Sequence, residues 1–194
     1  MRAEPFIIWF IGVPAAGKTT IAAAVRDAVD ARVEVLDSDE VRMRLTPTPD
    51  WSDVERQLFY RALNEIAQRL VKHGISVLIA ASGGGVDLDA FRERSVSRTF
   101  FVHVDLDLSQ AMKRRGGRLY RDASKGEIRL PLIRFRDEGP DGEDVAFCEE
   151  HGISAYELVL PRKVDLTLDG ALPPKVNAAA VLALLDADQT AMAP

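Results

Sequence analysis

Residues 6–19 of the chain are Phe6-Ile7-Ile8-Trp9-Phe10-Ile11-Gly12-Val13-Pro14-Ala15-Ala16-Gly17-Lys18-Thr19. The first six form an unbroken apolar run, which is typical of a strand buried on both faces of a parallel sheet. The last eight match the pattern G-x-x-x-x-G-K-[ST] at every defined position. Glycines in such a loop let successive backbone N–H groups point at phosphate oxygens, and the following helix adds the positive end of its dipole. The segment therefore predicts a phosphate-binding loop, or P-loop.

The P-loop pattern assigns roles to individual residues. Contacts with a bound nucleotide are expected from Gly12, Ala15, Ala16, Gly17, Lys18, Thr19 and Thr20. Lys18 is a predicted catalytic residue, because its ammonium group can reach the β- and γ-phosphates. Thr19 is a predicted Mg²⁺ ligand through its hydroxyl group.

The composition excludes several function classes. The chain has 194 residues, of which 47% are hydrophobic and 28% charged, enough for one core and its surface. A net charge of -5 argues against a nucleic-acid-binding protein. Cys148 is the single cysteine, so no intrachain disulfide is expected. The apolar run at residues 6–11 is too short for a signal peptide or a membrane span, which predicts a cytoplasmic protein without membrane contact.

Strands and helices alternate along the chain. Further strands are expected at residues 33–36, 75–81, 99–104 and 164–168, and helices at 20–29, 108–115 and 175–185. A long helix capped by Ser52 or Asp53 is expected to end at Lys72, with one apolar face: Leu58, Phe59, Ala62, Leu63, Ile66, Ala67 and Leu70. This order predicts an α/β fold, a three-layer αβα sandwich of the P-loop NTPase type with a doubly wound parallel sheet.

A single domain is expected over residues 1–194, with a lid region at about 116–161. That region has glycines, prolines and arginines followed by acidic residues, and a long segment of weak periodicity is typical of an inserted lid. A solvated surface excursion is the alternative.

The remaining motifs favour a small-molecule kinase. The N-K-x-D motif of switch GTPases is absent, and Asp105 after an apolar strand is only a weak Walker-B acid. Small size, an acidic pair at Asp37 and Asp39, and an arginine-rich lid region are instead features of phosphoryl transfer to small hydroxyl acceptors.

Five segments, in the same order, resemble motifs of adenylylsulfate (APS) kinases. Leu36-Asp37-Ser38-Asp39-Glu40-Val41-Arg42 resembles the family's L-D-G-D-N-V-R, and Trp51-Ser52-Asp53-Val54-Glu55-Arg56 resembles its F-S-x-x-D-R. Residues 73–80 resemble A-G-x-x-V-I-x-A, residues 119–128 resemble L-Y-x-x-A-x-x-G-E-I, and residues 156–160 resemble P-E-L-V-L.

The resemblance implies further functional residues. ATP would phosphorylate the 3′-hydroxyl of APS with Mg²⁺, so ATP and Mg²⁺ are the expected cofactors. Asp37 resembles the carboxylate that bonds the acceptor hydroxyl, and Asp39 its catalytic partner near the metal. Contacts with the acceptor are implied for Arg42, Trp51, Arg56 and Phe59, the two arginines facing its anionic groups, and contact with the nucleotide for Arg114.

Several positions depart from the family pattern on the acceptor side. Glu40 and Phe59 replace asparagines, residues 83–86 are Gly-Gly-Gly-Val in place of S-P-Y-R, and the lid motif G-F-T-G-I-D-D-P-Y-E is absent. These departures predict an APS kinase-like enzyme that phosphorylates a small anionic hydroxyl acceptor other than APS. Two alternatives remain: a genuine APS kinase, and a non-catalytic ATP-binding regulatory module. A homodimer is compatible with the sequence.

Overall fold

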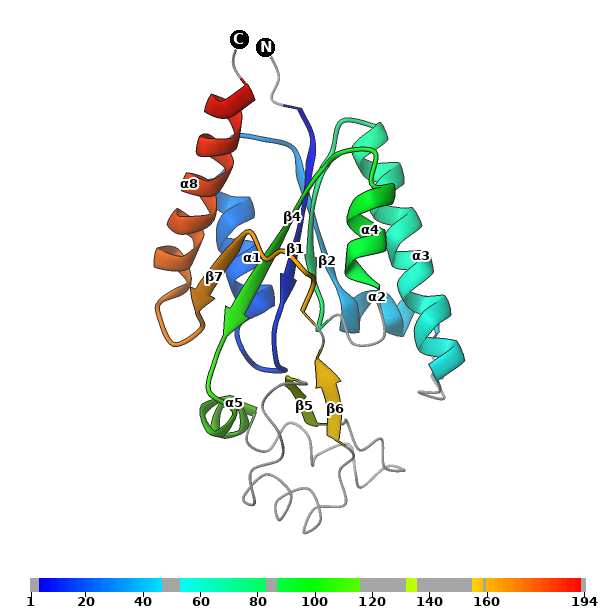
Figure 1. Cartoon of the computed structure of the whole chain (residues 1–194), viewed down its shortest axis with the longest axis vertical. Coiled ribbons are helices and arrows are strands. Elements are labelled where there is room, and N and C mark those ends of the chain that lie inside the picture. The colour runs from blue at the N-terminus through cyan, green and yellow to red at the C-terminus, as the bar shows by residue number, and fades with distance from the viewer. Residues whose placement is uncertain are drawn as a thin grey trace.

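The computed structural model describes residues 4–46, 53–82, 87–115, 132–135, 155–158 and 160–192. Its centre is a five-stranded sheet in the order β2-β3-β1-β4-β7. These strands are β1 (Phe6–Ile11), β2 (Val33–Asp37), β3 (Ser76–Ala80), β4 (Arg98–Asp105) and β7 (Leu166–Asp169). Every pairing is parallel, so the carboxyl ends of the strands share one edge of the sheet (Figure 1).

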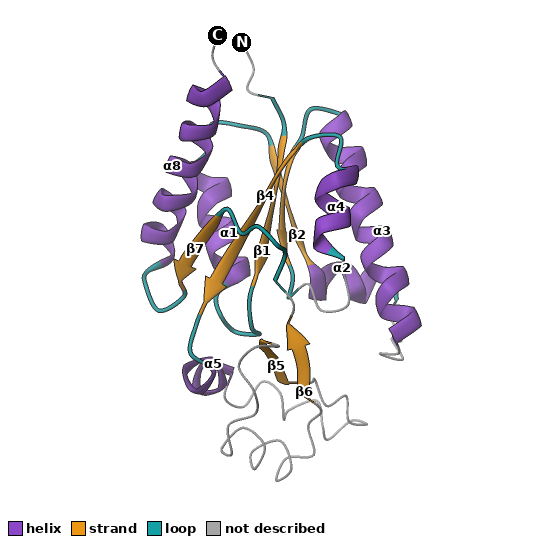
Figure 2. Cartoon of the chain, viewed as in Figure 1, coloured by secondary structure: helices purple, strands orange, loops and turns teal. Residues whose placement is uncertain are grey.

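Helices cover both faces of this sheet. They are α1 (Lys18–Ala28), α2 (Ser38–Leu45), α3 (Asp53–Lys72), α4 (Leu88–Arg94), α5 (Leu108–Arg115) and α8 (Pro174–Met192). Figure 2 shows α1 and α8 on one side of the sheet and α3 and α4 on the other. The predicted three-layer α/β sandwich is therefore confirmed.

Strand β1 explains why its sequence is apolar throughout. Phe6, Ile8 and Phe10 belong to the core cluster that includes residues of α1 and α8. Ile7, Trp9 and Ile11 belong to the cluster that includes residues of α3 and α4. Successive side chains of a strand point to opposite faces. A central strand covered on both faces must therefore be apolar at every position, as these six residues are.

Several local predictions differ from the structure. Helices α2 and α4 were not expected, because each has only seven or eight residues and at least half of these are charged. Leu58 is 59% exposed and does not belong to the apolar face of α3. The buried positions of that helix include Phe59, Leu63 and Ala67, and Leu58 lies about 100° of rotation away from Phe59.

The lid region falls largely outside the described residues. Within it, β5 (Leu132–Phe135) and β6 (Ala155–Leu158) pair in parallel as a second, two-stranded sheet. Residues 116–131, 136–154 and 159 are not among those that the structure describes. None of the described helices is long and apolar enough to cross a membrane.

Candidate active site

The P-loop connects β1 to α1 at the carboxyl edge of the sheet. Gly17 is the N-cap of α1 and has a φ of 99°, a conformation that favours glycine. Gly12 packs closely against β4: a Cβ atom there would lie 2.4 Å from the carbonyl oxygen of Val104. The two glycines of the motif therefore have separate functions, one at the helix start and one in strand packing.

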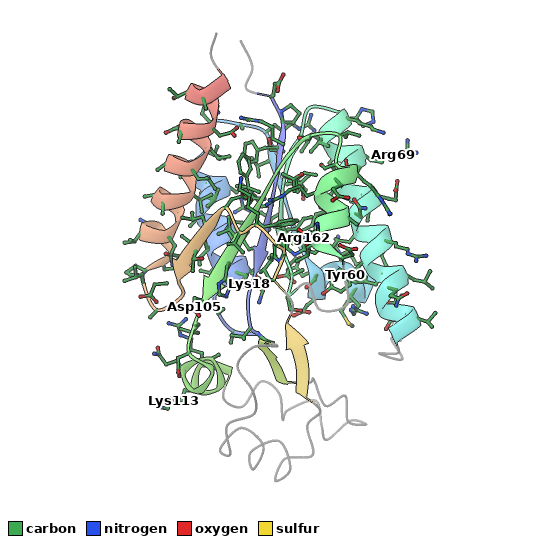
Figure 3. The ribbon with its side chains drawn as sticks, in the orientation of Figure 1. Lys18, Tyr60, Arg69, Asp105, Lys113 and Arg162 are labelled. Carbon is green, nitrogen blue, oxygen red and sulfur yellow. The ribbon has the colours of Figure 1, made fainter. Side chains whose placement is uncertain are left out.

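Lys18 is held by the loop that precedes it. Its ammonium group donates hydrogen bonds to the carbonyl oxygens of Gly12 at 3.0 Å and Val13 at 2.8 Å. These bonds fold the side chain back across the P-loop, near the carboxyl edge of the sheet (Figure 3). A cation in this place can stabilise the phosphate charge of a bound nucleotide.

Asp37 links the P-loop to α2. As the N-cap of α2, its Oδ1 atom accepts hydrogen bonds from the backbone amides of Asp39 at 2.8 Å and Glu40 at 3.3 Å. Its Oδ2 atom accepts a hydrogen bond of 2.5 Å from the Thr19 hydroxyl. Asp37 caps the helix because β2 continues to Asp37 and α2 begins one residue later, at Ser38.

A cavity of about 670 Å³ opens over these residues. It is lined by Pro14, Ala15, Gly17, Lys18, Thr19, Thr20, Asp37, Ser38, Asp39, Glu40, Ala80, Ser82 and Arg114. Ser82 was not predicted as a site residue. Its position just after β3 could have indicated this role, since ligands of open α/β sheets bind at the carboxyl ends of strands. Two of the predicted nucleotide contacts, Gly12 and Ala16, are not among the lining residues, and Ala16 is fully buried.

Arg114 reaches the same cavity from α5. Its Nη1 atom donates a hydrogen bond of 2.8 Å to the carbonyl oxygen of Gly170, in the turn after β7. Gly170 lies tightly against the P-loop, because a Cβ atom there would lie 2.9 Å from the carbonyl oxygen of Ala16. The cavity is thus lined by two cations, Lys18 at the end of the P-loop and Arg114 from α5.

The predicted acceptor contacts have a different environment. Arg42 and Phe59 do not line this cavity and instead pack against each other between α2 and α3. Trp51 and the side chain of Arg56 lie outside the described part of the structure.

The cavity has the oxygen donors that suit Mg²⁺. The Thr19 hydroxyl and the carboxylates of Asp37, Asp39 and Glu40 all line it, and Mg²⁺ prefers hard oxygen ligands. Among the described residues, no group of three or more His, Cys, Asp or Glu side chains forms a metal cage. Hard oxygens of this kind suit a cation that is held by one or two protein ligands together with substrate phosphates.

His103 lies on β4, beside the end of β1, and is 8% exposed. Burial lowers the pKa of its imidazole below the usual 6.5, because desolvation penalises the charged form. The nearby carboxylate of Asp105 opposes this effect.

Comparisons with known proteins identify relatives of this chain. A family model described as adenylylsulphate kinase matches residues 4–146. The chain is 33% identical over 144 residues to a probable adenylyl-sulfate kinase of Archaeoglobus fulgidus, covering 72% of this chain and 93% of that protein. It is 32% identical over 153 residues to the adenylyl-sulfate kinase of Myxococcus xanthus, covering 74% and 82%.

The fold has a close match among solved structures. The APS kinase CysC of Mycobacterium tuberculosis, solved in complex with AMPPNP and APS, superposes with a TM-score of 0.70. The match covers 94% of this chain and 98% of that one at 24% identity, which shows a shared fold.

Proposed function

The chain belongs to the adenylylsulphate kinase family and is a kinase, and we propose that it transfers the γ-phosphoryl group of ATP to the 3′-hydroxyl of APS. The observation that carries this proposal is the contact between Asp37 and Thr19, which joins the acceptor side of the site to the phosphate side. The relatives named adenylyl-sulfate kinase support APS as the acceptor.

The prediction of an acceptor other than APS is not supported. It depended partly on Phe59 in place of an asparagine, but the Phe59 side chain is 3% exposed and packs beneath Arg42 instead of lining the cavity. It depended also on Glu40, which does line the cavity, and on residues 83–86 and the lid motif, which lie outside the described residues. The comparisons favour a genuine APS kinase instead.

In the proposed reaction each of these side chains has a role. The acceptor oxygen attacks the γ-phosphorus, a new oxygen–phosphorus bond forms, and the bond to the β,γ-bridging oxygen breaks, so that ADP leaves. Asp37 orients the hydroxyl and takes its proton, which requires its Oδ2 atom to exchange Thr19 for the acceptor. Lys18 and Arg114 stabilise the charge on the transferred group and on ADP.

Mg²⁺ fits the oxygen donors of the cavity, with Thr19 and Asp39 as its protein ligands in this proposal. When bound, it would neutralise phosphate charge and hold the β- and γ-phosphates in one orientation.

The test is ADP release with APS, together with mass-spectrometric identification of the product as the 3′-phosphorylated nucleotide. We expect a kcat/KM with APS above about 10⁴ M⁻¹s⁻¹, within the normal range for enzymes. Lys18→Ala serves as the inactive control. Release of ADP with another hydroxylated phosphate ester, but not with APS, would refute APS as the acceptor while leaving the kinase assignment intact.

A further inference from the structure

A second cavity, of about 280 Å³, lies between α3 and α4. Figure 1 shows these two helices side by side on the same face of the sheet. We call this space the α3–α4 cavity; it shares no lining residue with the catalytic cavity. Ligand pockets usually have volumes of about 300–1,000 Å³, so a cavity of this size suits a small molecule. Its lining residues are Gln57, Tyr60, Arg61, Asn64, Asp87, Ala90, Phe91 and Arg94.

The lining residues form one face of each helix. Four come from α3 and four from positions 87–94, and both sets have successive spacings of three, one and three residues. This spacing places side chains on a single face of a helix. A helix face that meets a neighbouring helix is normally apolar, but five of these eight residues are polar or charged. The two faces therefore enclose a largely polar cavity where an apolar contact would be expected.

Two aromatic rings lie at the base of the α3–α4 cavity. Tyr60 and Phe91 are 7% and 3% exposed, so each presents only part of its ring to the cavity. Both rings pack against Trp9 of β1, with centroid distances of 6.2 Å for Tyr60 and 5.0 Å for Phe91. These contacts fix the rings to the central sheet, so the cavity has a preformed apolar base.

Two arginines at the cavity have no protein partner. Arg61 and Arg94 are exposed, and neither forms an ion pair or a hydrogen bond with another described residue. Asp87 is the acidic residue of the lining, and its Oδ1 atom already accepts a hydrogen bond of 2.9 Å from the amide of Ala90. The described lining thus carries two positive charges and one negative charge, on a chain whose net charge is -5. A cleft with such a local excess of positive charge attracts anions.

The guanidinium groups indicate the kind of anion. Each guanidinium presents a planar fork of N–H donors that binds two oxygens at once. One fork covers both oxygens of a carboxylate, whereas a phosphate or sulfate ester has three terminal oxygens and can accept from two forks. The pair Arg61 and Arg94 therefore favours a tetrahedral oxyanion.

Asn64 supplies an acceptor that lacks a donor. Its Oδ1 atom is buried and has no hydrogen-bond partner in the part of the chain that the structure describes. A buried acceptor without a partner is costly. Rotation about the last side-chain bond turns the carboxamide toward the cavity, where a hydroxyl or amine of a ligand would donate to it.

We propose that the α3–α4 cavity is a second ligand site, which binds a small organic phosphate or sulfate ester. Arg61 and Arg94 bind the anionic group, the rings of Tyr60 and Phe91 contact its apolar body, and Asn64 accepts a hydrogen bond from its hydroxyl or amine group. The proposal does not depend on APS as the acceptor, because the site lies outside the catalytic cavity and its test measures binding.

The test is isothermal calorimetry of the full chain with phenyl phosphate, which combines a tetrahedral anion with an aromatic body. Mg²⁺ and a saturating non-hydrolysable ATP analogue fill the P-loop during the titration. We expect binding to weaken by about 10- to 100-fold in Arg61→Met and in Arg94→Met, as for the loss of a charged hydrogen bond. Methionine keeps an apolar stem at these exposed positions, so the fold is retained.

Arg69→Met is the matched control. Arg69 is an exposed arginine near the C-terminal end of α3 and does not line the cavity (Figure 3). Its substitution should leave the affinity unchanged. In the wild-type protein, phenyl phosphate should also slow hydrogen exchange at the amides of residues 57–64 and 87–94.

Related probes identify the ligand class. Tighter binding of phenyl phosphate than of phenyl sulfate would assign a phosphate ester, and the reverse order a sulfate ester. Inorganic phosphate should bind more weakly than phenyl phosphate, because it has no apolar body to contact the rings. At least one hydroxylated derivative of phenyl phosphate should bind more tightly than the parent, and Asn64→Leu should remove that advantage.

Three results would overturn the proposal. The first is no binding of phenyl phosphate once the nucleotide site is filled. The second is equal affinity in Arg61→Met, Arg94→Met and the wild type, since the anion would then bind elsewhere. The third comes from light scattering: if either substitution converted a dimer into a monomer, the cavity would belong to an interface between two copies of the chain.

Discussion

Replacing Asp37 by asparagine separates the structural role of this side chain from its chemical role. An asparagine keeps one oxygen that can accept the hydrogen bonds from the amides of Asp39 and Glu40, and asparagine and aspartate are equally good helix caps. It loses the negative charge, the base, and the oxygen that accepts from Thr19. The expected loss of stability is one charged hydrogen bond at a solvent-accessible position, about 1 kcal/mol.

The expected loss of activity in Asp37→Asn is much larger. General base catalysis contributes about 10²- to 10⁴-fold, so kcat should fall by that factor, which corresponds to about 3–5 kcal/mol in the activation barrier. The affinity for ATP should change little, because the phosphate contacts are supplied by the P-loop and Lys18. The assays are ADP release, isothermal calorimetry with a non-hydrolysable ATP analogue, and urea unfolding.

A matched control is available at the start of α4. Asp87 caps that helix through a 2.9 Å hydrogen bond from the amide of Ala90, and it does not line the catalytic cavity. Asp87→Asn should therefore have a similarly small effect on stability and none on kcat. A kcat within about threefold of wild type in Asp37→Asn would refute its role as the base. An equal loss of kcat in Asp87→Asn would show that the assay reports on folding.

Three further results are expected. Lys18→Ala should lower turnover by at least about 10³-fold in the ADP-release assay, because no other P-loop side chain supplies a cation, and near-wild-type turnover would contradict the assignment. Gly12→Ala should markedly lower the urea midpoint, since the new Cβ atom would meet the Val104 carbonyl oxygen at 2.4 Å; an unchanged midpoint would count against this packing. His103→Gln should reduce the loss of stability between about pH 7.5 and about pH 5.5. The unfolded chain binds this proton more tightly than the folded one, so wild-type stability falls as the pH drops below 6.5, by at most about 1.4 kcal/mol per pH unit; equal losses in the two proteins would disprove a contribution from His103.

The long apolar runs and the P-loop pattern could be recognised locally, and the strand and helix predicted from them agree with the structure. Strand β1 and the helix after the loop lie where the sequence indicated, because a strand buried on both faces and a glycine-containing turn leave strong local signals. Helices α2 and α4 left no such signal. Each is short and largely charged, and α2 docks mainly through the side chain of Arg42.

Asp37 and Phe59 show which residue placements follow from the sequence and which depend on the tertiary structure. The place of Asp37 at the end of a strand is a local property, so its position at the carboxyl edge of the sheet follows from the sequence alone. For Phe59 the sequence left two assignments, the apolar face of its helix and the acceptor contact implied by the resemblance, because a phenylalanine on a helix can face either the core or a ligand. Only the packing of α2 on α3 decided that its ring lies under Arg42, since that contact joins two helices whose relative orientation no local pattern specifies.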